Sequence, residues 1–401
     1  MKRFIITNKN PTNLSTDFVD KFCNLPIYLD YMATTPIDPS VCERMNQFMG
    51  PNGGFGNAAS TTHQYGRIAA LAIDRARSQI ATVTGASPQN LIFTSGATEA
   101  NNLAILGAAR FYRNQGRHLI TMSVEHKSVL DSFHQLEKEG FTVTYVRPEP
   151  DGLLDLNKLE AALTSTTILG SIMHVNNEIG VIQDIAAIGS ILRKRGVVFH
   201  VDAAQSIGKL PINLAELPID LMSLSAHKNY GPKGIGVLYV NNKPRIRLQP
   251  QSFGGGHELG LRSGTLPTHQ IVGMGEAVWL AEQNREYEQT RLLNLRHKLW
   301  EGIKLIPGIK LNGHPTHRVA GNLNIMFTDI EGGALLSALN GLAISSTSAC
   351  MAASNQPSYV LQELGLNNSQ ASSSIRLSLG RYTTEEQIDR TIGIILSGLK
   401  F

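Results

Sequence analysis

The chain has few of the features that mark secreted, membrane or disulfide-stabilised proteins. Its 401 residues include three cysteines, Cys23, Cys42 and Cys350, and no Cys-x-x-Cys pair. An odd number of cysteines without that spacing argues against a disulfide framework and against a structural zinc site. The sequence also lacks a run of about 18 apolar residues, the length that a membrane-spanning helix needs. We therefore expect no metal site, no contact with the membrane, and a reducing compartment, the cytoplasm.

The excess of basic over acidic residues is also small. The 36 basic and 32 acidic residues leave a formal net charge of +4 without a long basic run, so we expect no direct binding of nucleic acid. Hydrophobic residues make up 42% of the chain, an ordinary balance for a globular protein long enough for two domains. Residues 1–24 contain no apolar run of about 7–15 residues, which a secretory signal would have. We interpret them as an N-terminal extension.

From about residue 90, strand-like and helix-like segments alternate along the chain. The strand-like segments are 91–94, 118–126, 142–146, 167–175, 196–204, 220–225 and 234–240. Several of them are continuous apolar runs, as expected for strands that helices cover on both faces. The alternation predicts an α/β fold with a large, mostly parallel sheet.

The pattern changes after about residue 270. Strand-like runs at 321–327 and 374–380 follow long helical segments, which predicts a smaller α+β domain. The last helix should begin near Thr383, because Thr383 and Glu386 have capping-box spacing. The expected division is an N-terminal extension at 1–24, a large domain at 25–270 and a small C-terminal domain at 271–401 that carries Cys350, with 25–40 as a candidate to pack on the small domain.

Polar residues follow several of the predicted strands, and in open α/β sheets the ends of strands carry the functional residues. Ala97 and Thr98 open a helix, whose free N–H groups suit a phosphate; an ordinary helix cap is the alternative. Asp202 ends an apolar strand, where it needs a partner. That partner is a protonated ring nitrogen, as in enzymes that use pyridoxal phosphate; the alternative is a structural cap or an ion pair.

Lys228 directly follows an apolar strand, in the segment SLSAHKNYGP. Burying an ammonium group is costly, so this lysine either extends to solvent or forms a Schiff base with an aldehyde cofactor. Ser225 and His227 lie beside it and could donate hydrogen bonds to a phosphate. Because helix start, acid and lysine occur in order on successive strand ends, the pattern favours a pyridoxal phosphate site.

Further candidates lie outside this core set. His126 suits stacking on a flat ring and proton transfer, or it is a structural histidine. The glycine-rich segment 254–265 is either a turn or a loop that reaches a phosphate of a neighbouring subunit. Cys350 lies among small and polar residues, which indicates an accessible and reactive thiol rather than a buried one. Arg376 could bind a carboxylate with two hydrogen bonds, or form a surface ion pair.

Taken together, the chain resembles the class-V, fold-type I enzymes that use pyridoxal phosphate, and more closely the cysteine desulfurases of the IscS/NifS type. The resemblance rests on the segments YLDYMATTPID, FTSGATEANNLAI, HVNNEIGVIQD, HVDAAQSIGK, AHKNYGPKGIGVLYV, RSGTLPTHQIVGMGEA and SIRLSLGRYTTEEQID. It extends from about Leu25 to the C-terminus.

This resemblance implies a role for each candidate in cofactor binding. Lys228 would be the Schiff-base lysine, Asp202 would pair with the ring nitrogen, and His126 would stack on the ring and act in catalysis. Asn177 and Gln205 would bond the ring oxygen. The phosphate ligands would be Ala97, Thr98, Ser225 and His227, with Thr265 supplied by the partner subunit of a homodimer.

The resemblance also implies the reaction. Arg376, with Asn177, would bind the carboxylate of L-cysteine. Cys350 would take the sulfur as a persulfide and release alanine. The sulfur would then pass to an iron–sulfur scaffold protein and other acceptors, including tRNA thiolation, and Cys350 could transiently contact a cluster. The alternatives are a selenocysteine lyase, another pyridoxal phosphate-dependent lyase or transaminase, or a non-catalytic sulfur-relay scaffold.

The chain departs from the family pattern in three places. Around the cysteine, Thr347 replaces a glycine and Met351 a threonine, which should make the loop stiffer and less polar. About 24 residues precede the usual start. The chain also ends at Phe401 without the further tail that helps relatives dock a scaffold, so scaffold binding is the implied property most affected.

Overall fold

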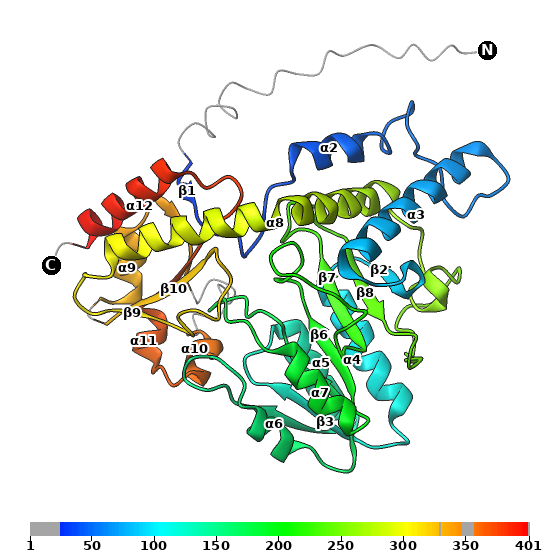
Figure 1. The fold of residues 1–401 in the computed structure, drawn as a ribbon, viewed down its shortest axis with the longest axis horizontal. Coiled ribbons are helices and arrows are strands. Elements are labelled where there is room, and N and C mark those ends of the chain that lie inside the picture. Colours follow the sequence, from blue (N-terminus) through cyan, green and yellow to red (C-terminus); the bar gives the residue numbers. More distant parts are fainter. Residues whose placement is uncertain (1–24, 329, 347–356, 400–401) are drawn as a thin grey trace, which may run out of the picture.

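The computed structural model describes residues 25–328, 330–346 and 357–399. Within them a seven-stranded sheet has the order β2 (Leu91–Thr94), β8 (Gly236–Val240), β7 (Leu221–Ser225), β6 (Val198–Asp202), β5 (Thr167–Ser171), β3 (His118–Met122) and β4 (Thr142–Val146). Strand β8 runs antiparallel to both of its neighbours, and the other pairs are parallel. The predicted α/β fold with a large, mostly parallel sheet is confirmed (Figure 1).

Helices cover both faces of this sheet. On one face, α4 (Ala97–Tyr112) and α5 (Lys127–Lys138) share a buried core with strand residues such as Leu119 and Leu238. On the other face, α3 (Gln64–Thr84), α7 (Ile185–Lys194) and the start of α8 (Thr268–Ile303) pack with residues such as Phe93 and Met222. The short helix α6 (Leu156–Ala162) lies beside α7. Because successive strand residues point to opposite faces, strands buried on both sides appear in the sequence as continuous apolar runs.

Strands β3, β5 and β6 end earlier than the apolar runs predict. The run 118–126 ends as a strand at Met122, and the run 196–204 ends at Asp202. The residues that follow are mostly still buried, but they form loops. An apolar run therefore predicts burial more accurately than it predicts where a strand ends. The residues beyond the strand ends form the loops that carry site residues.

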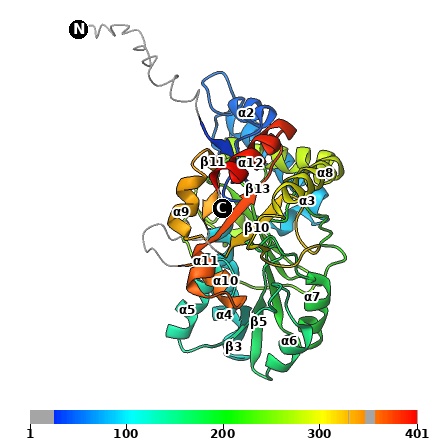
Figure 2. The same cartoon turned by 90° about the vertical axis from the view of Figure 1, so that its left-hand side faces the viewer.

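A second group of elements surrounds a smaller sheet. Its antiparallel order is β12 (Ser345–Ser346), β13 (Ser374–Ser378), β10 (Asn322–Phe327) and β9 (Ile309–Leu311). The accompanying helices are α9 (Gly332–Ala338), α10 (Tyr359–Glu363), α11 (Asn368–Ser372) and α12 (Glu385–Gly398). Figure 2 shows α9 and α12 at this end of the molecule, where Leu335 and Ile395 share a core with Leu377. The capping box of α12 is formed one residue later than predicted, by Thr384 and Gln387, because Thr383 instead accepts from Gly380 N.

Helix α8 joins the two groups of elements. Its early residues Met274 and Val278 belong to the core of the large sheet, whereas Leu295 and Leu299 belong to the core of the small sheet. Figure 1 shows this helix running from one part of the molecule to the other. The predicted boundary at residues 270 and 271 lies inside α8, and the division into domains stays a prediction. No helix among the described residues has the length and apolarity needed to cross a bilayer.

The first described residues connect both parts. Strand β1 (Ile27–Tyr28) pairs in parallel with β11 (Leu342–Ala343), beside the small sheet. The chain then crosses to the large sheet, where the backbone N–H of Thr35 donates to the carbonyl oxygen of His227 (3.0 Å). It continues into α2 (Pro39–Asn46), which is capped by Asp38 and packs along α8. The segment between β1 and α2 therefore lies next to the residues that follow β7.

Candidate active site

A cavity of about 480 Å³ lies where the strands β2, β6 and β7 end, between the two groups of elements. Ten of the predicted site residues line it: Ala97, Thr98, His126, Asn177, Asp202, Gln205, Ser225, His227, Lys228 and Arg376. The cavity also has walls that the sequence did not predict: Met32, Ala33, Glu99, Ser128, Met173 and Lys233. The roles assigned to the predicted site residues stay predictions, but the structure brings the side chains of those residues together.

The N-terminus of α4 faces the cavity through Ala97 and Thr98. The negative charge of the first-turn residue Glu99 is balanced by the Arg262 guanidinium, which donates to its carboxylate (Nε–Oε1, 2.9 Å). Ser95 N donates to Oε2 of the same carboxylate (2.6 Å). Burial opposes ionisation of Glu99, but these bonds hold its pKa below the usual value. The partial positive charge of the helix end therefore remains available to an anion.

Asp202 ends β6 and is 5% exposed. Its Oδ1 accepts from Ala204 N (2.9 Å), and its Oδ2 accepts from the side-chain amide of Asn101 (2.8 Å). Asn101 is fully buried on α4, and the sequence analysis did not assign it a role. Its place one helical turn after Ala97, on the same face, is the sequence signal that could have found it. These two bonds fix the orientation of the carboxylate at the cavity wall.

His126 caps the start of α5. Its Nδ1 accepts from the backbone N–H of Ser128 (3.1 Å), so in the neutral ring the proton lies on Nε2. Burial lowers the pKa of His126, which the nearby Asp202 carboxylate only partly offsets. His126 is thus a neutral ring at neutral pH, which suits stacking on a flat aromatic group and donation from Nε2.

Lys228 lies in the turn after β7. Its Nζ donates to the backbone oxygens of Met32 (2.9 Å) and Ala33 (2.5 Å), both on the segment that crosses from β1. His227 beside it bonds Thr34 Oγ1 through Nδ1 (3.1 Å). Burial, with the neighbouring lysines, lowers the pKa of His227 to about 4. The lysine that follows a buried strand is therefore accommodated by backbone oxygens at the wall of the cavity.

Arg376 reaches the cavity from β13 of the small sheet and is 3% exposed. Its Nη2 donates to Asp30 Oδ1 (2.6 Å) and its Nη1 to the backbone oxygen of Asn177 (2.6 Å). Among the described residues, Arg376 Nε and Asn177 Oδ1 are buried without a hydrogen-bond partner. Buried polar atoms are normally paired. Two such atoms at one cavity indicate a polar ligand that both accepts and donates hydrogen bonds.

Two predicted residues remain, Thr265 and Cys350. Thr265 is exposed in the loop before α8, and its predicted place in a partner subunit stays a prediction. Cys350, together with Thr347 and Met351, lies outside the described residues. The last described residues before them form β12, in which Ser345 pairs with Arg376.

Comparison with known proteins identifies the family. Residues 27–391 match the family Aminotransferase class-V. The chain is 59% identical over 371 residues to "Cysteine desulfurase IscS" of Escherichia coli O139:H28, and the match covers 92% of each chain. The chain belongs to the class-V aminotransferases, among the cysteine desulfurases of the IscS/NifS type. The predicted family is thereby confirmed, and with it the cofactor, because these enzymes depend on pyridoxal phosphate.

Solved structures agree with this assignment. A structure titled "NIFS-LIKE PROTEIN" superposes with a TM-score of 0.86 at 35% identity, covering 92% of this chain and 98% of that one. A second, "SspA in complex with cysteine", gives a TM-score of 0.79 at 39% identity and covers 89% of this chain and 100% of that one. The fold of this desulfurase is thus shared along nearly its whole length.

Proposed function

We propose that this enzyme is a cysteine desulfurase that converts L-cysteine to L-alanine and forms a persulfide on Cys350. The observation that carries the proposal is the convergence of Lys228, Asp202, His126 and Arg376 on one cavity at the N-terminus of α4. The 59% identity to a cysteine desulfurase supports the same reaction. The complex of the related SspA with cysteine supports L-cysteine as substrate.

The residues around the cavity fit pyridoxal phosphate. The α4 N-terminus, Ser225 and His227 would hold the phosphate, and the fixed Asp202 carboxylate would face a protonated ring nitrogen. Lys228 would bond covalently to the aldehyde carbon, and the neutral ring of His126 would stack on the cofactor. The bound cofactor supplies a sink for the electrons released at the substrate Cα.

Arg376 and Asn177 would hold the substrate. A carboxylate next to Arg376 Nε and an amino group next to Asn177 Oδ1 would satisfy the two unpaired atoms. Lys228 Nζ, once the substrate amino group has taken its place on the cofactor, would remove the proton from Cα, and His126 Nε2 would give a proton to the reacting sulfur or take one from it. Because Arg376 is fixed by Asp30, the carboxylate would be bound in one orientation.

The sulfur transfer balances without an external oxidant. The Cys350 thiolate attacks the substrate sulfur, the Cβ–S bond breaks and an S–S bond forms. The substrate Cβ is reduced and gains a proton, and the sulfur bound to Cys350 is the oxidised product. The two thiol protons supply the hydrogen that alanine gains and the persulfide proton.

The acceptors and the assembly state belong to the same proposal. We propose that the persulfide sulfur passes to an iron–sulfur scaffold protein and to tRNA thiolation in the cytoplasm. We also propose a homodimer in which Thr265 of each subunit completes the phosphate site of the other. The position of Thr265 on an exposed loop outside its own cavity supports this arrangement.

The test is a turnover assay on the full chain with its cofactor. L-cysteine should yield alanine and a persulfide on the peptide that contains Cys350, detected by mass spectrometry. Cys350→Ser should keep the yellow cofactor but lose the persulfide, whereas Cys42→Ser, which removes an exposed cysteine, should keep both. Lys228→Ala should lose the covalent cofactor. Alanine production at the parental rate by Cys350→Ser would contradict the proposal, and preference for L-selenocysteine in that variant would favour a selenocysteine lyase.

A further inference from the structure

A hydrogen-bond chain connects a second lysine, Lys209, to the Schiff-base lysine. Lys209 Nζ donates to Gln205 Oε1 (2.8 Å), and Gln205 Nε2 donates to the backbone oxygen of Met32 (2.9 Å). Lys228 Nζ donates to the same oxygen (2.9 Å). Gln205 is 4% exposed and lines the active-site cavity. The chain therefore runs from Lys209 through the cavity wall to Lys228.

The partners of Gln205 determine which way its amide faces. Lys209 Nζ donates its hydrogen bond to the carbonyl oxygen of the amide, and as an ammonium group it could bond no other end. A backbone oxygen only accepts, so Met32 requires the Nε2 end. Both ends agree on one orientation, in which the second N–H of Nε2 remains for the cavity. If Lys209 were absent, Met32 alone would hold this orientation, and Oε1 would lose its lysine donor.

The backbone holds Lys209 at this place. The turn after β6 closes with hydrogen bonds from Ser206 N to Ala203 O and from Lys209 N to Ser206 O, both 2.9 Å. Gly208 has a left-handed backbone (φ 73°), and a Cβ there would lie 2.3 Å from Asn229 Oδ1. Only glycine permits this close approach. The turn that carries Lys209 is therefore packed against the turn that carries Lys228.

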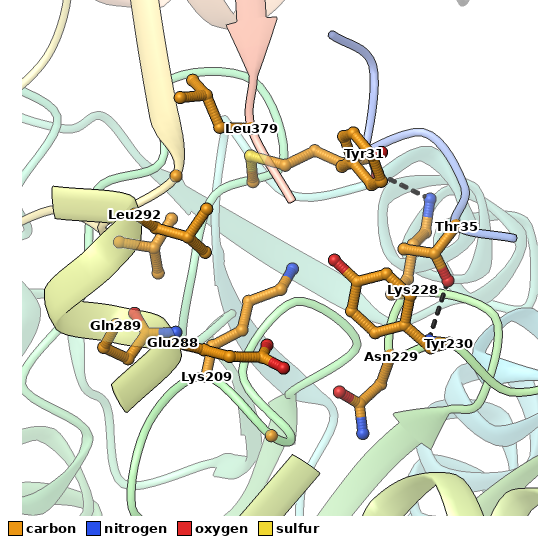
Figure 3. Close-up of a pocket in the computed structure, with 14 residues that line it drawn as sticks. Tyr31, Thr35, Lys209, Lys228, Asn229, Tyr230, Glu288, Gln289, Leu292 and Leu379 are labelled. Carbon is orange, nitrogen blue, oxygen red and sulfur yellow. Dashed lines mark hydrogen bonds between the residues drawn. The ribbon is translucent and has the colours of Figure 1, made fainter. Parts of the chain in front are cut away.

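The charge of Lys209 is poorly compensated by the protein. Its hydrogen-bond partner is an amide, and burial, together with the cations Lys228 and Arg376, lowers its pKa to about 7. The amine end projects into a cavity of about 30 Å³ beside Lys228, which Glu288 and Tyr230 also line (Figure 3). This volume holds about two water molecules. Such a costly group indicates a role that an apolar residue could not fill.

We propose that Lys209 is a positioning residue that holds the Gln205 amide with its N–H group, and not its carbonyl oxygen, toward the ring oxygen of the bound cofactor. The inference rests on the proposed function, because it requires the cofactor in this cavity. A donor at that place stabilises the negative ring oxygen. The donor would thereby lower the pKa of the proton that the ring oxygen shares with the nitrogen joining Lys228 to the cofactor.

The experiment follows the visible absorbance of the cofactor-bound full chain as a function of pH, without substrate. Two variants form a matched pair, since both remove the charge of Lys209 but only one removes the donor. Lys209→Met should raise the pH midpoint of the absorbance change by about one unit, because the ring oxygen loses its donor. Lys209→Gln keeps an N–H donor for Gln205 and should stay close to the parental midpoint.

The same measurement in the Gln205→Leu background shows whether Lys209 acts through Gln205. Gln205→Leu alone should raise the midpoint, and adding Lys209→Met should raise it no further. An equal extra shift in that background, or equal shifts in Lys209→Met and Lys209→Gln, would overturn the proposal in favour of charge alone. A parent chain that binds no cofactor would refute the proposed function instead. In turnover, Lys209→Met should lower kcat about tenfold and leave KM for L-cysteine nearly unchanged.

Discussion

The buried carboxyl of Glu178 should make the stability of this enzyme depend on pH near neutrality. Glu178 follows Asn177 and is 7% exposed. Its Oε2 accepts from Ser358 Oγ (2.5 Å), at the start of α10. Burial raises the pKa of Glu178 to about 7, although the Ser358 hydrogen bond and the Arg376 cation act in the opposite direction.

The sign and the size of the effect follow from this pKa. Below the ordinary value of 4.5, the carboxyl is protonated in the folded and unfolded states alike. As the pH rises from 4.5 to about 7, only the unfolded chain releases the proton, so the folded state loses stability. The difference between 7 and 4.5 is about 2.5 pKa units, which corresponds to about 3 kcal/mol of unfolding free energy above neutral pH.

Glu178→Gln tests this prediction, because glutamine has the same shape and can still accept from Ser358. The assay is urea-induced unfolding of the cofactor-bound parent and variant at a series of pH values. Between about pH 4 and pH 8, the variant should gain about 3 kcal/mol relative to the parent. Glu216→Gln, which removes an exposed carboxyl, controls for the loss of a carboxyl group as such. A stability difference between Glu178→Gln and the parent that stays flat across this range would refute the reasoning.

Two further predictions concern the cavity. Asn101→Leu removes the donor to Asp202 Oδ2, so the affinity of the apoenzyme for pyridoxal phosphate, measured by absorbance titration, should fall about tenfold; unchanged affinity would show that Asn101 does not hold the carboxylate for the cofactor. Arg376→Lys loses the planar guanidinium that bonds Asp30 and the backbone of Asn177, so KM for L-cysteine should rise at least about tenfold while the visible cofactor band is retained. Steady-state kinetics with an unaltered KM would contradict the substrate role of Arg376.

The sequence predicted the large sheet and the gathering of site residues well, for one physical reason. Parallel strands end at one edge of a sheet, so side chains that follow β6 and β7, such as Asp202 and Lys228, meet whatever loops separate them. The same rule placed Ala97 at a helix end beside them. The family resemblance added the identity of the cofactor and the substrate, which strand ends alone could not specify.

Other contacts were beyond sequence reasoning because they use the backbone or join distant segments. The oxygens of Met32 and Ala33 bind Lys228 across nearly 200 residues of chain, and a carbonyl oxygen has no sequence signal of its own. Asp30 fixes Arg376 over a still longer separation. Such pairs depend on how β1 crosses between the two sheets, which neither apolar periodicity nor local propensity encodes.

The charge around the cavity indicates what kind of ligand it is prepared for. The carboxylates of Asp30 and Glu99 are already bonded to arginines, Arg376 and Arg262. Burial is the largest cause that lowers the pKa of His227 to about 4, and the nearby lysines are the next. The electrostatic potential at His227 is therefore positive. A neutral ligand would leave that repulsion in place, whereas a ligand with anionic groups would relieve it. In the proposed function, a phosphate at the α4 end and a substrate carboxylate at Arg376 would be two such groups.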